Sequence, residues 1–173
     1  RTRQRSYLPV KPFYASKTPK ELRDCWGTPQ WLIDRLSLEF DFAIDAAADE
    51  HNRKFPLYFK QGLGFNWADF CPEGKWVWNN PPFSFVDPWV DQWIQCSESD
   101  RGVVSIVNAQ TGARWFHKAL EACSEARFSI GRVAFIHPAT GKRVAGNNLG
   151  QVLFVFEPGK LGEKRIGTFK GTK

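Results

Sequence analysis

The chain has 173 residues, of which 42% are hydrophobic and 24% charged, with a formal net charge of +6. This length fits one domain with a core large enough to fold unaided, and it excludes a second catalytic domain. No apolar run is long enough to span a bilayer and no signal peptide is recognisable, so we expect no membrane partner. The basic balance favours a polyanionic partner.

The four cysteines, at positions 25, 71, 96 and 123, are widely spaced, with no Cys-x-x-Cys pair and no neighbouring pair of histidines. This spacing indicates neither a zinc site nor a disulfide framework. We therefore expect no metal ion and a reduced, intracellular setting.

The first 24 residues are basic and contain proline, and we expect an irregular arm. Thr28 and Pro29 then predict the start of a helix, with Thr28 as the N-cap and Pro29 in the first turn. Apolar residues at helical spacing follow, among them Trp31, Leu32 and Leu36. Any well-started helix has this pattern, so this stretch alone indicates no function.

A strand is predicted at 40–45, and a run of small residues follows it. Asp45 stands at its carboxyl end, where an open α/β sheet forms its ligand crevice. Ala46, Ala47 and Ala48 would let the backbone approach a ligand closely, although an ordinary strand-to-helix turn explains them equally well. Roughly thirty residues separate Asp45 from the next clear strand. This length leaves room for one parallel crossover and one short strand near 57–59.

The most informative stretch is 75–84. Residues 76–78 predict a buried strand, which Pro81 and Pro82 must end because neither has an N–H to donate. The chain leaves the sheet at Asn80, and Phe83 follows on a loop. An amide oxygen, a backbone carbonyl and an aromatic plane can together hold a flat heterocycle that carries an amine. The alternative is a plain Pro-Pro turn with Phe83 in the core.

The second half of the chain predicts a helix from Asp87, a buried strand at 102–107, a helix around 115–123, and an antiparallel pair formed by 128–136 and 149–156. The loop between the paired strands carries Lys142, Arg143 and Asn147. It is either a solvated hairpin end or a loop that reads nucleic acid, since cations neutralise phosphates and asparagine can read adenine. We expect one domain at 25–158 and a flexible basic tail at 159–173.

The motif order Thr-Pro, Asp-Ala-Ala-Ala and Asn-Pro-Pro-Phe resembles the γ class of S-adenosylmethionine-dependent amino-methyltransferases. The surrounding chain resembles the phage-type, Dam-like DNA N6-adenine methyltransferases. The second motif departs from the usual glycine-rich form. The resemblance implies an α/β fold, an abbreviated Rossmann-like sheet of the class I methyltransferases, mostly parallel and closed by an antiparallel C-terminal hairpin.

The resemblance also implies roles for individual residues. The catalytic residues would be Asn80, Pro81, Pro82 and Phe83. S-adenosyl-L-methionine would be bound by Trp26, Thr28, Pro29, Asp45, Ala46, Ala47, Asn52 and Asn80. Duplex DNA would be contacted by Ser84, Arg114, Lys142, Arg143 and Asn147.

The activity so implied is direct, in-line methyl transfer to N6 of an adenine that has been flipped out of duplex DNA, in a bacterial cytoplasm if the protein is phage-encoded. Two alternatives stay open. One is methylation of RNA adenine or of another amine, and the other is a non-catalytic α/β module that binds nucleic acid. The sequence predicts neither the target site nor the oligomeric state.

Overall fold

The computed structural model describes residues 22, 24–60, 62–145 and 147–172. The predicted basic arm therefore lies almost entirely outside the described residues. The helices are α1 (Gln30–Leu36), the short 3-10 helix η2 (Trp67–Asp69), α2 (Asp87–Glu98) and α3 (Arg114–Ala122). The strands are β1 (Phe42–Asp45), β2 (Leu57–Tyr58), β3 (Trp76–Asn79), β4 (Gly102–Asn108), β5 (Glu125–Ile130), β6 (Phe135–Ile136), β7 (Arg143–Val144), β8 (Gln151–Phe156) and β9 (Arg165–Lys170).

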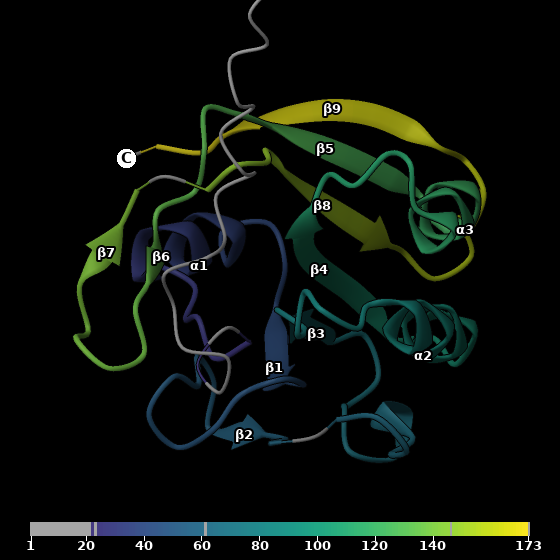
Figure 1. Ribbon diagram of the computed structural model, residues 1–173. Helices are drawn as coiled ribbons and strands as arrows, with labels where there is room; N and C mark the ends of the chain where they lie inside the picture. The colour runs from purple at the N-terminus through teal and green to yellow at the C-terminus, as the bar shows by residue number, and fades with distance from the viewer. Residues whose placement is uncertain (1–21, 23, 61, 146, 173) are drawn as a thin grey trace, which may run out of the picture.

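Seven strands form one sheet in the order β2-β1-β3-β4-β8-β5-β9 (Figure 1). Strand β8 runs antiparallel to both of its neighbours, β4 and β5, whereas the other pairs in this sheet are parallel. The predicted α/β fold with a mostly parallel, Rossmann-like sheet is confirmed, and so is the single short strand near 57–59. Strands β6 and β7 form a separate antiparallel hairpin beside the sheet.

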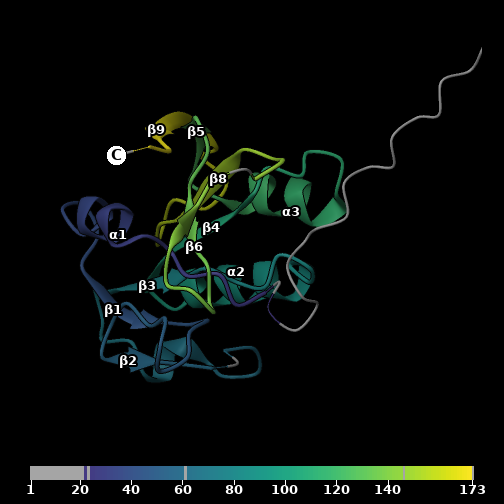
Figure 2. The ribbon, with the colours of Figure 1, turned by 60° about the vertical axis from the view of Figure 1, so that its left-hand side comes forward.

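Helix α1 covers one face of the sheet, and α2 and α3 cover the other (Figure 2). Successive side chains of a strand point to opposite faces, so β3 contributes to both layers. Val77 packs in the cluster that contains the α2 and α3 residues, while Trp78 packs with α1. Burial on both faces explains why the strand is apolar without alternation.

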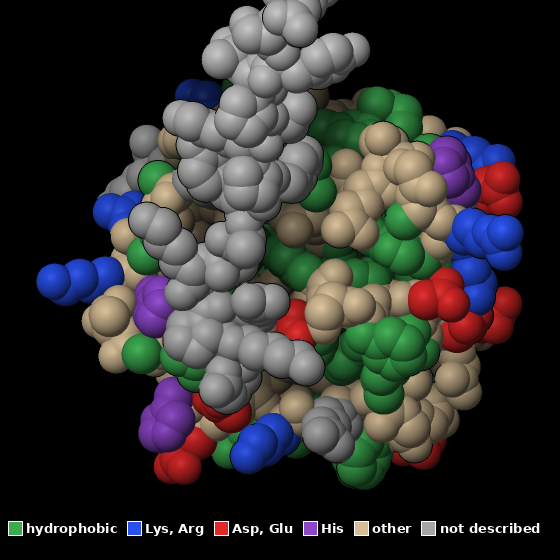
Figure 3. Space-filling view, viewed as in Figure 1, with side chains coloured by type: hydrophobic (Ala, Val, Ile, Leu, Met, Phe, Trp, Pro, Cys, Tyr) green, Lys and Arg blue, Asp and Glu red, His purple; other side chains and the backbone are tan. Residues whose placement is uncertain are grey.

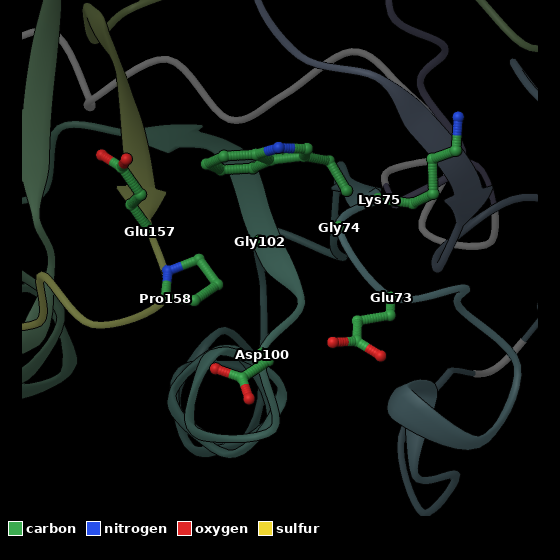
Figure 4. A pocket seen from close by; sticks show the side chains of 8 residues that line it. Glu73, Gly74, Lys75, Asp100, Gly102, Glu157 and Pro158 are labelled. Carbon is green, nitrogen blue, oxygen red and sulfur yellow. The ribbon is translucent and has the colours of Figure 1, made fainter.

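Close packing at the amino ends of β3 and β4 depends on Gly102. A Cβ on this residue would lie 2.2 Å from the ring of Trp76. Trp76 and Gly102 line a hollow together with Glu73, Asp100 and Glu157, and Figure 4 shows the last three around Gly102. This hollow lies at the opposite end of β3 from Asn80. Within the described residues, no group of three or more potential metal ligands occurs.

The structure corrects the prediction of a flexible tail after residue 158. Residues 165–170 form β9, which pairs in parallel with β5 over six positions, so the sheet extends beyond the predicted domain end. Only Phe169 of this strand is buried, and its other side chains are exposed or half-buried. The backbone ladder with β5 therefore holds a segment whose composition resembles a solvated tail.

Two further predictions differ in detail. Pro29, not Thr28, is the N-cap residue of α1, and no side chain within the described residues caps this helix. The antiparallel partner of β8 begins at Glu125 and ends at Ile130, because the chain then turns away through Gly131, which has a φ of 80°. Residues 135–136 belong instead to the β6–β7 hairpin. Among the described helices, none is long and apolar enough to cross a membrane.

Replacing Gly102 by alanine should force the Trp76 ring out of its place. We expect the free energy of unfolding to fall by about 1–3 kcal/mol, the usual cost of overpacking. Gly112→Ala is the matched control, because a Cβ at Gly112 would meet nothing within 4 Å. Urea denaturation measures both variants, and an equal effect of the two substitutions would contradict the packing role of Gly102.

Candidate active site

A cavity of about 380 Å³ lies beside the carboxyl ends of β1 and β3. Parallel strands of an open α/β sheet form their ligand crevices at this end. The cavity is lined by Asp24, Cys25, Ala47, Ala48, Asp49, Asn52, Lys60, Leu63, Asn80, Pro82, Phe85 and Trp89. The structure thus brings together residues of two predicted motifs, the segment after β1 and the Asn-Pro-Pro-Phe segment after β3.

The amide of Asn80 has a fixed orientation. Its Nδ2 donates a hydrogen bond of 2.9 Å to the backbone carbonyl of Trp26, which belongs to a segment 54 residues earlier in the chain. The nitrogen end of the amide is therefore held by the protein, and Oδ1 is the end available to accept a hydrogen bond from a ligand. This is the polarity needed to receive an amino group.

The preceding residue, Asn79, secures the end of β3 on the other face of the sheet. Its side chain is fully buried, and its Oδ1 accepts a hydrogen bond of 2.8 Å from Trp93 Nε1 on α2. Successive side chains at the end of β3 are therefore tied to different segments, Asn79 to α2 and Asn80 to Trp26.

Phe83 is half-buried on the loop that follows the two prolines. Its ring makes an edge contact with Phe135, with centroids 5.7 Å apart and planes 81° apart. The ring also packs against both hydrophobic clusters of the molecule. Phe83 therefore packs in the core while part of the residue stays accessible to solvent.

The Asp45 carboxylate is turned into the protein. It is 2% exposed, and it accepts hydrogen bonds from the backbone N–H groups of Lys54, at 2.9 Å, and Ala47, at 3.4 Å. Burial raises the pKa of Asp45 to about 6, against the lowering effect of these hydrogen bonds and of the Lys54 charge. Asp45 does not line the cavity, and it instead shapes the loop that does.

That loop is fixed by a second set of side-chain hydrogen bonds. Asp49 Oδ1 accepts from the N–H groups of His51 and Asn52, and Asn52 Oδ1 accepts from Asp49 N at 2.7 Å. A Cβ on Gly62 would lie 2.0 Å from the Ala46 carbonyl oxygen, so only glycine lets the chain around residue 62 approach this loop so closely. The close approach of the two chain segments thus depends on the small side chains of the alanines and on Gly62, which is distant from them in the sequence.

The predicted Thr-Pro segment lies next to Asn80, but Trp26, Thr28 and Pro29 do not line the cavity. Trp26 contributes its carbonyl, and Gly27 forms an isolated antiparallel bridge with Ile136 of β6. Thr28 is 2% exposed, and its Oγ1 is buried without a hydrogen-bond partner in the described part of the chain. Pro29 is also buried and begins α1.

The residues predicted to bind nucleic acid are spread over the surface. Lys142 and Arg143 are exposed on the β6–β7 hairpin, where cationic side chains protrude at the left edge of Figure 3. Arg114 is exposed at the first position of α3. Asn147 Nδ2 donates to the Val133 carbonyl at 2.9 Å, and Ser84 bonds to the Asp24 carboxylate through both its N–H and its hydroxyl. The last two therefore have internal hydrogen-bonding roles.

Apart from Asp49, which directly follows the run of alanines, six of the residues that line the cavity were not predicted from the sequence. They are Asp24, Cys25, Lys60, Leu63, Phe85 and Trp89. Trp89 has the helical spacing of a core residue, and the others belong to loops without a recognisable motif. Only Phe85 could have been noticed in the sequence, as an aromatic residue two positions after Phe83, and in the structure it is exposed.

The raised pKa of Asp45 predicts a pH-dependent stability. The folded state binds the Asp45 proton more tightly than the unfolded state does, so the protonated carboxyl contributes to the free energy of unfolding. This contribution is lost as the pH rises through about 6. Asp45→Asn cannot ionise and should gain stability relative to the native protein, on the order of 2–3 kcal/mol, from about pH 4 to about pH 8. Urea denaturation at both pH values measures this difference, and a difference that does not change with pH would contradict it.

Comparison with known proteins identifies the family of this chain. A family model described as DNA N-6-adenine-methyltransferase (Dam) matches residues 15–171. A protein of Escherichia phage T1 named DNA N-6-adenine-methyltransferase is 30% identical over 167 aligned residues, covering 87% of this chain and 70% of that protein. The protein of the same name from Haemophilus phage HP1 is 31% identical over 147 aligned residues, covering 83% and 84%. The chain belongs to the DNA N-6-adenine-methyltransferase family of enzymes, as the motif order suggested.

Proposed function

We propose that this protein transfers a methyl group from S-adenosyl-L-methionine to the N6 amine of an adenine in duplex DNA, and that the adenine is flipped out of the helix to reach the cavity. The observation that carries the proposal is the orientation of Asn80. Its Nδ2 is held by the Trp26 carbonyl at 2.9 Å, and its Oδ1 has no hydrogen-bond partner among the described residues, so Oδ1 can accept a hydrogen bond at the lining of the cavity.

The cavity fits the methyl donor in size and in chemistry. Its volume of about 380 Å³ lies in the range of small-molecule pockets. Ala47 and Ala48 line it with small side chains, and the carboxylates of Asp24 and Asp49 complement a cationic sulfonium. We propose that Asp49, Asn52 and Lys60 hold the donor, with Lys60 placed to meet its carboxylate. Asp45 would support this site through the loop it organises.

The bound donor supplies an activated methyl group on a sulfonium, so the protein must mainly prepare the acceptor. The N6 lone pair of adenine is delocalised into the ring and is a poor nucleophile. Asn80 Oδ1 and the Pro81 carbonyl would accept hydrogen bonds from the two N–H groups of this amine. These hydrogen bonds would draw the nitrogen toward a tetrahedral geometry. In-line placement of the amine against the methyl group supplies much of the remaining acceleration.

The exposed part of Phe83 would stack on the flipped base. Extrusion of a base costs a few kcal/mol of stacking and pairing energy. Stacking on an aromatic side chain returns about 1–3 kcal/mol, so Phe83 offsets part of this cost. The edge contact with Phe135 limits the rotation of the ring and so presents one face consistently.

Asn80→Ala should abolish methyl transfer and leave binding of the donor largely intact, because the amide acts on the acceptor. A decrease of several-hundred-fold in the single-turnover rate is expected for removal of a preorganised polar group at the reacting centre. Calorimetry with S-adenosyl-L-methionine checks binding. Asn66→Ala is the matched control, since Asn66 does not line the cavity. A near-native rate in Asn80→Ala would remove Asn80 from the site.

The cations of the β6–β7 hairpin should act on DNA affinity. Replacing Lys142 and Arg143 by alanine should weaken binding and reduce the slope of log K against log salt by about one unit for each phosphate that the variant no longer neutralises. The adjacent pair Lys164 and Arg165, near the far edge of the sheet, provides the control. Fluorescence anisotropy over a salt series measures both variants, and equal slopes would show that the hairpin end is only solvated.

A further inference from the structure

Strand β6 contacts the catalytic segment from outside the main sheet. Phe135 is 3% exposed, and its ring meets the edge of Phe83. The neighbouring Ile136 exchanges two backbone hydrogen bonds with Gly27, of 3.0 Å from Gly27 N and 2.8 Å from Ile136 N. One short strand therefore touches the aromatic residue of the tetrapeptide and the loop that faces its asparagine.

The contact continues from Gly27 to Asn80. The carbonyl that receives the Asn80 amide belongs to Trp26, the residue directly before Gly27. The Trp26 ring packs edge-on against His137, with centroids 4.8 Å apart. Residues 135, 136 and 137 thus fix Phe83, Gly27 and Trp26 in turn. If β6 moved, the acceptor for Asn80 Nδ2 and the packing surface of Phe83 would move together.

Within the described residues, the hydrogen bond of the Asn80 side chain and the aromatic contact of the Phe83 ring each come from one partner, although the Phe83 ring also packs against both hydrophobic clusters. There, the side chain of Asn80 forms its hydrogen bond with the Trp26 carbonyl and with no other group. The aromatic partner of the Phe83 ring, again among the described residues, is Phe135. Since an amide can rotate about its terminal torsion, the Trp26 carbonyl decides which atom of Asn80 faces the cavity.

We propose that β6 is a positioning element for catalysis, in which Phe135 sets the ring of Phe83 and the Gly27–Ile136 bridge sets the carbonyl that orients Asn80. Phe135 and Gly27 are positioning residues and do not touch the substrate. The proposal rests on the proposed function for its catalytic meaning, but the orientation of Asn80 can be measured without any methyl transfer.

The experiment compares Phe135→Ala and the milder Phe135→Leu with Phe169→Ala. Phe169 lies in the same hydrophobic cluster, but on β9, at the far edge of the sheet from the catalytic segment. The first readout is hydrogen exchange of the Asn80 side-chain amide, followed by NMR and assigned by the absence of its signal in Asn80→Ala. The second readout is the single-turnover rate at saturating DNA, measured together with the DNA affinity.

We expect both Phe135 variants to exchange the Asn80 amide protons at least about tenfold faster and to lower the rate by roughly ten- to a hundredfold, with DNA affinity unchanged within a factor of about two. Phe169→Ala should lower the melting temperature without either effect. If Phe135→Ala does not fold, Phe135→Leu decides. Unchanged exchange and an unchanged rate in a folded Phe135 variant would overturn the proposal. If the native protein transfers no methyl group, the exchange result still tests the positioning, and the proposed function fails separately.

Discussion

The hydrogen bond between Asn80 Nδ2 and the Trp26 carbonyl is the interaction on which the arrangement of the site depends. Pro81 and Pro82 end the backbone ladder of β3 at this point, so sheet pairing cannot hold the residues that follow. The side chain of Asn80 then becomes the link between the strand end and the segment before α1. Ser84 adds a second link through the Asp24 carboxylate. Because the Asn80 amide uses its donor end for this link, its acceptor end is left for a ligand.

The rest of the fold supports this link from both faces of the sheet. Trp78 packs on the α1 face, and Asn79 is tied to α2 through Trp93, so the last residues of β3 are held in place before the chain leaves the sheet. On the neighbouring strand, the buried Asp45 carboxylate organises the loop that lines the cavity. Its pKa of about 6 shows that keeping it charged in the folded state opposes stability at neutral pH, so the loop geometry is maintained at a cost in folding free energy.

Local patterns predicted much of this molecule. The apolar run at 76–78 and the Pro-Pro pair predicted both the strand and its end, and the short spacing after Asp45 predicted an abbreviated sheet with one short strand near residue 57. Strand β9 was not predicted, because it depends on pairing with β5 and buries only Phe169. Thr28 has the chemistry of a helix cap, yet its hydroxyl is buried and does not cap α1, a tertiary effect that local preference cannot show. The cavity was predicted through its motifs, but Asp24 and Lys60 reach it from loops whose positions are set by contacts distant in the sequence.

The most direct test of the proposed chemistry is nucleoside analysis of duplex DNA incubated with the purified protein and S-adenosyl-L-methionine carrying a tritiated methyl group. We predict that enzymatic digestion releases tritiated N6-methyladenine from the native reaction, and none from the Asn80→Ala reaction. Label recovered in N4-methylcytosine, label incorporated only when RNA is supplied, or no label in either nucleic acid would contradict the proposed chemistry.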